Sequence, residues 1–196
     1  MAFAFVVEDG SIVAGANSYV AVQEADDYLI QNPFVSPAWL ALTTAQKQYY
    51  LTWATRYLDH RAVWNGETTT ASNYNQSGSS LVQTWATPVS DTPQAQQPLR
   101  WPRVGVYDYD ERLIPSSEIP VQLKAATIEM ARYLLAQDRS VERPQDGLLE
   151  MRAGDVMLKF KPDYTLPIVP TDISFIIRGL GTIASGRTNF SKITRA

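Results

Sequence analysis

The chain of 196 residues contains no cysteine and a single histidine, His60. The first absence excludes disulfides and thiolate metal sites, and the second leaves little from which to build a histidine-based catalytic set. No window approaches the roughly 20 apolar residues of a transmembrane helix, and the apolar run in MAFAFVVEDG is too short for a signal peptide. We therefore expect a soluble, intracellular protein that is not an enzyme and holds no metal or cofactor.

Charged residues are also scarce, at 19%, and the net charge is -3 at pH 7. This balance gives no overall basic footprint for duplex nucleic acid. The first 46 residues contain no Lys or Arg and carry five acids: Glu8, Asp9, Glu24, Asp26 and Asp27. Residues 173–196 contain no acid and carry four cations: Arg178, Arg187, Lys192 and Arg195. Either both ends are simply solvated, or they meet complementary surfaces, such as neighbouring copies in a ring.

The spacing of apolar residues predicts a mainly α fold, a small helical bundle with a β-hairpin. Thr43 is expected to cap the helix at about 44–60, and Gly179 to end the last short one. Alternation around Val156 and Leu158 predicts the hairpin, at about 148–161. The expected helical segments, read from i, i+3, i+4 spacing, are 22–31, a single turn from Ser36-Pro37, 44–60, 120–138 and 170–179.

The remaining segments carry little helical pattern. Residues 3–7 (FAFVV) could form a short strand or a buried arm. Residues 67–98 are rich in Thr, Ser, Asn and Gln and predict a long inserted loop. The tail is polar and basic, with no core of its own. We therefore expect one helical domain over 1–179, including the polar loop and the hairpin, followed by an extended C-terminal arm over 180–196.

The stretch QPLRWPRVGVYDYDERLIPSSEIP, residues 97–120, is the most unusual part of the chain. Trp101 lies beside Pro102 and between Arg100 and Arg103. An aromatic ring between two arginines could stack on a base while the arginines contact phosphates. The favoured interpretation is architectural: Trp101 wedges the loop into the core and pins the connection between the two main helices. The arginines then pair with acids in the same or a neighbouring subunit.

Two further patterns allow a function besides a structural role. Asp108, Asp110 and Glu111 in YDYDE could hold a hard cation, but the Gly and the downstream Glu of an EF-hand loop are missing, which favours a solvated turn. Gly179-Leu-Gly181-Thr-Ile-Ala184 matches a loose dinucleotide fingerprint, yet too little chain follows it for the helix and strand that such a site needs. No Gly-x-Ser-x-Gly elbow occurs, which again argues against a hydrolase.

Several short motifs in order carry a resemblance to a phage family. They are VEDG from Val7, GANSYV from Gly15, A-x-x-Y-L-D ending at Asp59, LRWPRVGV from Leu99 and IPSSEIPVQLKAATIEMA from Ile114. Together they resemble small phage proteins often labelled DnaT-like single-stranded-DNA-binding proteins, which are structurally similar to the head-to-tail adaptors (connectors) of tailed bacteriophages. The resemblance covers most of residues 5–160. The 67–98 loop and the tail after 180 are longer than this pattern leads us to expect.

The resemblance implies a structural virion protein of the phage neck, made in the host cytoplasm. Such an adaptor forms a ring, a homo-dodecamer, below the portal protein and joins it to a tail or nozzle protein, with genome DNA passing through the lumen without specific binding. The arm residues expected to contact the portal are Arg187, Phe190, Lys192 and Arg195. The residues expected to join neighbouring subunits or anchor loops are Arg100, Trp101, Arg103, Glu24, Asp26 and Asp27.

The family label suggests an alternative: a single-stranded-DNA-binding, primosome-like protein. This function requires a basic groove with several stacking aromatic rings. The net negative charge argues against it, and salt-dependent binding of oligonucleotides would support it.

Overall fold

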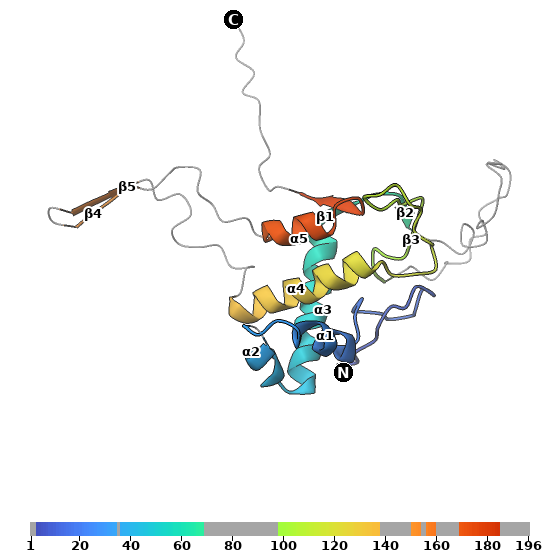
Figure 1. Cartoon of the computed structure of the whole chain (residues 1–196), viewed down its shortest axis with the longest axis horizontal. Coiled ribbons are helices and arrows are strands. Elements are labelled where there is room, and N and C mark those ends of the chain that lie inside the picture. Colours follow the sequence, from blue (N-terminus) through green and yellow to red (C-terminus); the bar gives the residue numbers. More distant parts are fainter. Residues whose placement is uncertain are drawn as a thin grey trace, which may run out of the picture.

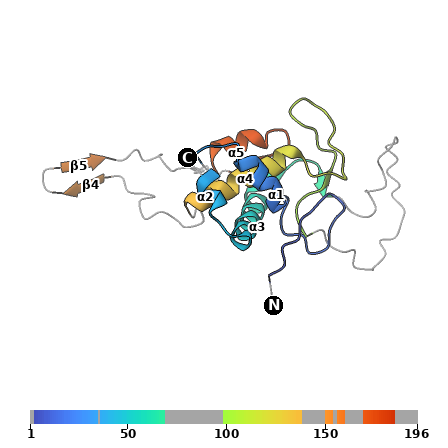
Figure 2. The same ribbon diagram turned by 60° about the horizontal axis from the view of Figure 1, so that its bottom comes forward.

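The structure is a computed structural model that describes residues 3–34, 36–68, 98–137, 150–153, 156–159 and 169–184. Its centre is formed by two long helices that cross, α3 (Thr44–Arg61) and α4 (Val121–Ala136) (Figure 1). The short helices α1 (Val22–Leu29) and α2 (Ser36–Leu40) lie at one end of this pair, and α5 (Thr171–Ile176) packs on α4 (Figure 2).

The core lies where these helices meet, because each helix buries the apolar face that its spacing predicts. Leu51 and Leu58 of α3, Leu123 and Met130 of α4, and Ile173 of α5 are all fully buried. At the start of α3 the Thr43 hydroxyl accepts the Gln46 N–H, while the Gln46 side chain accepts the Thr43 N–H. This capping box confirms the predicted N-cap and defines where α3 begins.

Three two-stranded antiparallel sheets complete the described part. The hairpin of β4 (Glu150–Ala153) and β5 (Val156–Lys159) pairs Glu150 with Lys159 and confirms the predicted one. The other two sheets join distant segments and were not predicted: β1 (Ala62–Trp64) pairs with β6 (Gly181–Ile183), and β2 (Glu67–Thr68) with β3 (Arg103–Val104). These strands have two or three residues, too few to show an alternating pattern.

Other expectations differ from the structure in detail. Residues 3–7 form no strand; only an isolated parallel bridge joins Val7 to Ser18. Pro120 is the N-cap of α4 rather than part of its first turn, and no side chain caps this helix. The arm expected from residue 180 starts within the folded domain, because Leu180 is fully buried and 181–183 forms β6.

The predicted mainly helical fold is therefore confirmed. Most of the polar loop, residues 69–97, lies outside the described residues, as does the tail from 185. No helix among the described residues is long and apolar enough to cross a membrane.

Candidate nucleic-acid interface

Trp101 anchors the unusual stretch in the core. Its side chain is 0% exposed, and its ring meets Trp64 edge-on, with 5.9 Å between ring centroids. The peptide bond to Pro102 is cis. A ring with no exposed surface cannot stack on a base, so of the two interpretations of Trp101 the structure supports the wedge.

A buried tyrosine and a partly buried aspartate hold the backbone beside this wedge. The Tyr19 hydroxyl donates to the Asp59 carboxylate, with oxygen–oxygen distances of 2.7 and 2.9 Å, and accepts the backbone N–H of Trp101 at 3.2 Å. Asp59 also accepts the backbone N–H of Arg100 at 3.1 Å. These bonds join three segments: Tyr19, which precedes α1, the end of α3, and the Trp101 segment. They also place Arg100 at the surface.

Burial shifts both titrating groups of this pair. It raises the pKa of Tyr19 well above 10.0, and the neighbouring Asp59 charge raises it further. Burial also raises the pKa of Asp59 above 3.8, although the bonds from Tyr19 and Arg100 act in the opposite direction. Tyr19 therefore remains a neutral hydrogen-bond donor at neutral pH, and Asp59 binds a proton more tightly when the chain is folded.

We expect this shift to appear in the pH dependence of stability. A raised folded pKa means that the stabilisation from protonated Asp59 is complete below the unfolded pKa of 3.8 and is lost as the pH rises through the folded pKa. The free energy of unfolding of the wild type, minus that of Asp59→Asn, should therefore fall as the pH rises above about 3.8. Urea unfolding at several pH values measures it; a difference that rises with pH would contradict the expectation.

Arg103 is held in a different way from the one expected. Its guanidinium donates to the backbone carbonyls of Asn65 and Gly66, both at 2.6 Å, and to that of Arg100 at 3.2 Å. Neither Arg100 nor Arg103 forms a salt bridge with the other described residues. Pairing with an acid of a neighbouring subunit stays a prediction. Burial, and then the nearby charge of Arg100, lower the pKa of Arg103. Two cations held close together favour an anion beside them.

These arginines border a shallow pocket of about 430 Å³ beside the end of α3. Its only acid is Asp59, whose carboxylate is already engaged by Tyr19 and Arg100. The pocket is lined by Asp59, His60, Ala62, Val63, Trp64, Arg100 and Arg103.

A row of exposed aromatic and basic side chains on α3 leads to this pocket. Tyr49, Trp53, Arg56 and His60 follow each other at helical spacings of four, three and four, so they share one face, and all four are exposed. The Arg56 guanidinium lies 5.7 Å from the centre of the Trp53 ring, and Phe3 packs against Tyr49 with 4.9 Å between ring centroids. We call these four residues the α3 stripe.

The α3 stripe was not predicted from the sequence, because the prediction for this helix rested on its opposite, apolar face. The periodic signal was present: two aromatic residues, an arginine and a histidine follow each other at i, i+4, i+7 and i+11. Helical spacing alone, however, does not tell an exposed aromatic face from a second buried face.

The three acids expected at subunit contacts have partners within the chain. Glu24 pairs with Lys124 at 2.6 Å. Asp26 accepts the Trp39 indole N–H at 2.6 Å and pairs with Lys47 at 2.9 Å. Asp27 accepts the Gln23 amide at 2.9 Å. Part of the acidic character of the first 46 residues is thus neutralised inside the fold, and a contact with another subunit stays a prediction.

The acids of YDYDE lie in a tight turn closed by Arg112. The Asp108 carboxylate accepts the backbone N–H groups of Asp110 and Arg112 and pairs with the Arg112 guanidinium at 3.0 Å, while Asp110 pairs with it at 2.7 Å. Within the described ranges no group of three or more His, Cys, Asp or Glu residues could hold a metal ion. The predicted portal-contacting residues lie outside the described residues: Arg187, Phe190, Lys192 and Arg195.

Comparison with known proteins adds one finding. The model of a protein family described as "Putative DnaT-like ssDNA binding protein" matches residues 3–77 and 82–196. No curated protein matches the chain. No solved structure matches it either.

Proposed function

Since the chain belongs to the family of DnaT-like ssDNA-binding proteins, we propose that it binds single-stranded DNA through the α3 stripe and the arginines beside it. Bases would stack on Trp53 and Tyr49, and Arg56, Arg100 and Arg103 would contact phosphates. Such contacts select single strands over duplexes but distinguish poorly between sequences, because every base presents a π-face.

The observation that carries this proposal is the α3 stripe itself. An exposed Trp with an Arg over its ring, next to an exposed Tyr, combines the two elements that single strands require: a stacking platform and a positive charge. The overall charge of -3 opposes binding at long range. It acts weakly at this site, because charges beyond about 10 Å are largely screened at about 0.1 M salt.

Fluorescence anisotropy with labelled oligo(dT) tests the proposal. If Arg56, Arg100 and Arg103 each contact one phosphate, log K should fall with log salt with a slope of about -2, from about -0.7 per contact. Raising the salt from about 50 to about 200 mM should then weaken binding about 20-fold. A duplex of the same length should bind more weakly, since its bases are not free to stack. No binding at about 50 mM salt would contradict the proposal.

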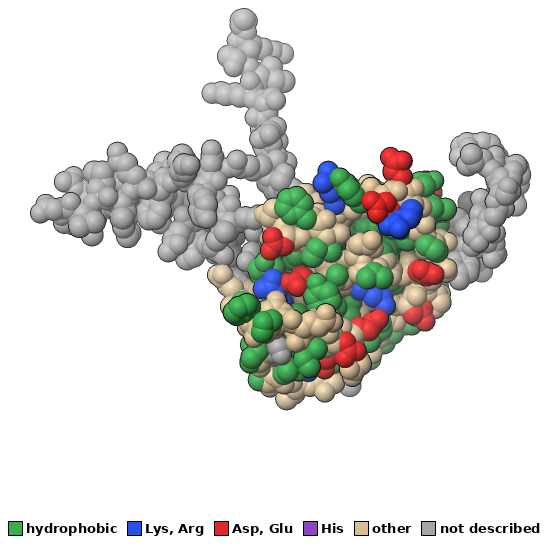
Figure 3. Space-filling model, viewed as in Figure 1, with side chains coloured by type: hydrophobic (Ala, Val, Ile, Leu, Met, Phe, Trp, Pro, Cys, Tyr) green, Lys and Arg blue, Asp and Glu red, His purple; other side chains and the backbone are tan. Residues whose placement is uncertain are grey.

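A second candidate function is the head-to-tail adaptor role implied by the resemblance to phage proteins. A group of exposed apolar side chains favours it: Ile30, Phe34 and Leu40 surround the connection between α1 and α2, and Phe34 is 93% exposed. Figure 3 shows hydrophobic side chains gathered where Figure 1 draws α2. Exposed apolar groups of this kind often mark protein contacts. The partners would be neighbouring copies in a dodecamer, the portal protein and a tail or nozzle protein, in the virion neck.

Native mass spectrometry and negative-stain imaging of the chain with a portal protein test this second function. A ring on the portal that is lost in Phe34→Asp would support it. The variant should fold normally, because Phe34 is almost fully exposed. Truncation of the tail should begin at residue 185, since Leu180 and β6 belong to the folded domain. A chain that stays monomeric with the portal would contradict the adaptor role.

A further inference from the structure

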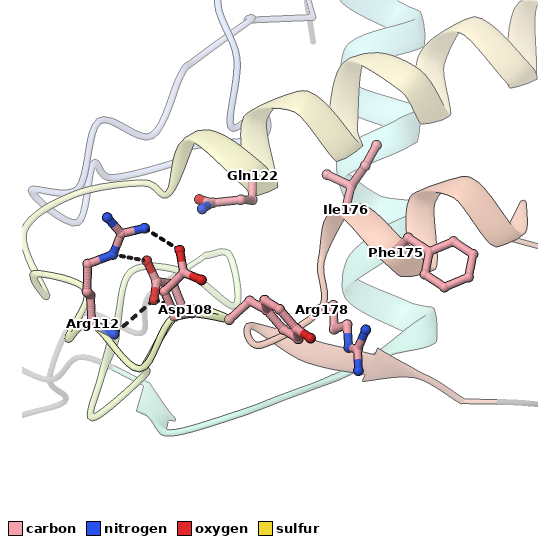
Figure 4. Close-up of a pocket in the computed structure, with 8 residues that line it drawn as sticks. Asp108, Arg112, Gln122, Phe175, Ile176 and Arg178 are labelled. Carbon is pink, nitrogen blue, oxygen red and sulfur yellow. Dashed lines mark hydrogen bonds and ion pairs between the residues drawn. The ribbon is translucent and has the colours of Figure 1, made fainter.

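A second pocket lies beyond the arginines, between α4, α5 and the loop of residues 106–114. It has a volume of about 360 Å³, near the lower end of the range of about 300–1,000 Å³ for small-ligand sites. Gln122 comes from the first turn of α4, Phe175 and Arg178 from α5 and the turn after it, and Asp108 and Arg112 from the loop (Figure 4). Three separate segments thus converge on one hollow.

We propose that this pocket accepts one nucleobase of a bound single strand, an inference that rests on the proposed DNA-binding function. Tyr109 and Phe175, two of its lining residues, are 64% and 67% exposed and offer ring faces on which a base can stack. The Arg178 guanidinium lies 4.5 Å from the centre of the Tyr109 ring, which extends the stacking surface. Unpaired bases stack on aromatic rings and on guanidinium planes alike.

The polar groups around the pocket suit a base and its phosphate. The Gln122 side chain is exposed and forms no hydrogen bond with the other described residues, so its amide can donate to and accept from a base edge. Arg112 is already neutralised by Asp108 and Asp110. Arg178 forms no salt bridge among the described residues and is therefore the cation available to a phosphate.

The loop that carries Tyr109 is held firmly against α5. Backbone bonds between Val106 and Ile114, and between Asp108 and Arg112, close it. Gly179, at φ +94°, lies so close that a Cβ there would be 2.7 Å from the Tyr109 nitrogen. Only glycine permits both this conformation and this approach, so the chain places Tyr109 at the pocket before any ligand binds.

The position of the pocket links it to the first interface. Asn65 accepts the Arg103 guanidinium through its carbonyl at 2.6 Å and donates its amide to the Gly179 carbonyl at 2.7 Å. Asn65 therefore connects the arginines of the first pocket to the turn that carries Arg178.

Photo-crosslinking with oligo(dT) that contains 5-iodo-deoxyuridine tests the inference in the full chain, since this base crosslinks to aromatic rings on which it stacks. Mass spectrometry should locate crosslinks at Tyr109 or Phe175 as well as on the α3 stripe. Phe175→Ala should remove the Phe175 crosslink and weaken oligo(dT) binding about fivefold, which corresponds to one stacked base. Gln122→Ala should also weaken oligo(dT) binding. Val121→Ala is the matched control, because Val121 is exposed beside Gln122 but does not line the pocket.

The possible results separate this inference from the function on which it rests. If oligo(dT) binds but crosslinks only to the α3 stripe, and Phe175→Ala binds like Val121→Ala, the pocket accepts no base while the proposed function stands. If oligo(dT) does not bind at all, both are wrong.

Discussion

Trp101→Ala is expected to lower the free energy of unfolding by about 3–5 kcal/mol, the usual cost of removing a large buried aromatic side chain. The ring is fully buried against Trp64, so its removal leaves a cavity that the surrounding helices cannot fill. Domains of this size are stable by about 5–15 kcal/mol, so the variant should lose a large share of its stability. Urea unfolding followed by circular dichroism measures the change.

Two control variants show whether the ring volume causes this loss. Trp101→Phe should cost clearly less, because it keeps an aromatic ring and removes an indole N–H that has no hydrogen-bond partner among the described residues. Phe34→Ala should change stability by no more than about 0.5 kcal/mol, because Phe34 is almost fully exposed. A Trp101→Ala protein as stable as the wild type would mean that the loop does not depend on this wedge.

Trp53→Ala is expected to weaken binding to oligo(dT) about 5- to 150-fold, the equivalent of about 1–3 kcal/mol for one stacked base. Trp53 is 39% exposed in the middle of the α3 stripe, and no other ring on α3 can replace it beside Arg56. Fluorescence anisotropy at low salt measures the change, and a thermal melt confirms that the variant is folded.

The matched variants separate stacking from charge. Trp53→Phe retains a ring and should bind within a few-fold of the wild type. Arg56→Ala should reduce the salt slope by about 0.7, whereas Arg56→Lys should leave it unchanged, because the slope counts phosphate contacts. If Trp53→Ala binds as tightly as the wild type, the α3 stripe is not the DNA-binding surface.

Helix positions were predicted from the sequence because they depend on local signals. Thr43 and Gln46 form a capping box within one turn, and the apolar faces of α3 and α4 repeat at helical spacing. The hairpin at 150–159 was also predicted, since an alternating pattern on both sides of a turn is a local signal. The prediction that Trp101 wedges into the core rested on its Pro neighbour and on the size of its ring.

The site residues were harder to predict, because their roles depend on contacts between distant segments. Arg103 was expected to pair with an acid, yet its guanidinium meets the carbonyls of Asn65 and Gly66, which lie almost forty positions earlier. The pairing of β1 with β6 brings Gly179 next to Asn65 and so positions the turn that carries Arg178. A three-residue strand carries no local sequence pattern that predicts such a pairing.

By itself, therefore, the sequence determined the helices, their buried faces, the hairpin and the absence of cysteine. These properties follow from composition and from periods of a few residues. Only the tertiary structure decided which aromatic rings are exposed. Trp101 and Trp53 are the same residue type, yet Trp101 is fully buried and Trp53 is exposed. It also decided which arginines stay unpaired, because the free energy of a charge depends on neighbours that only folding brings close.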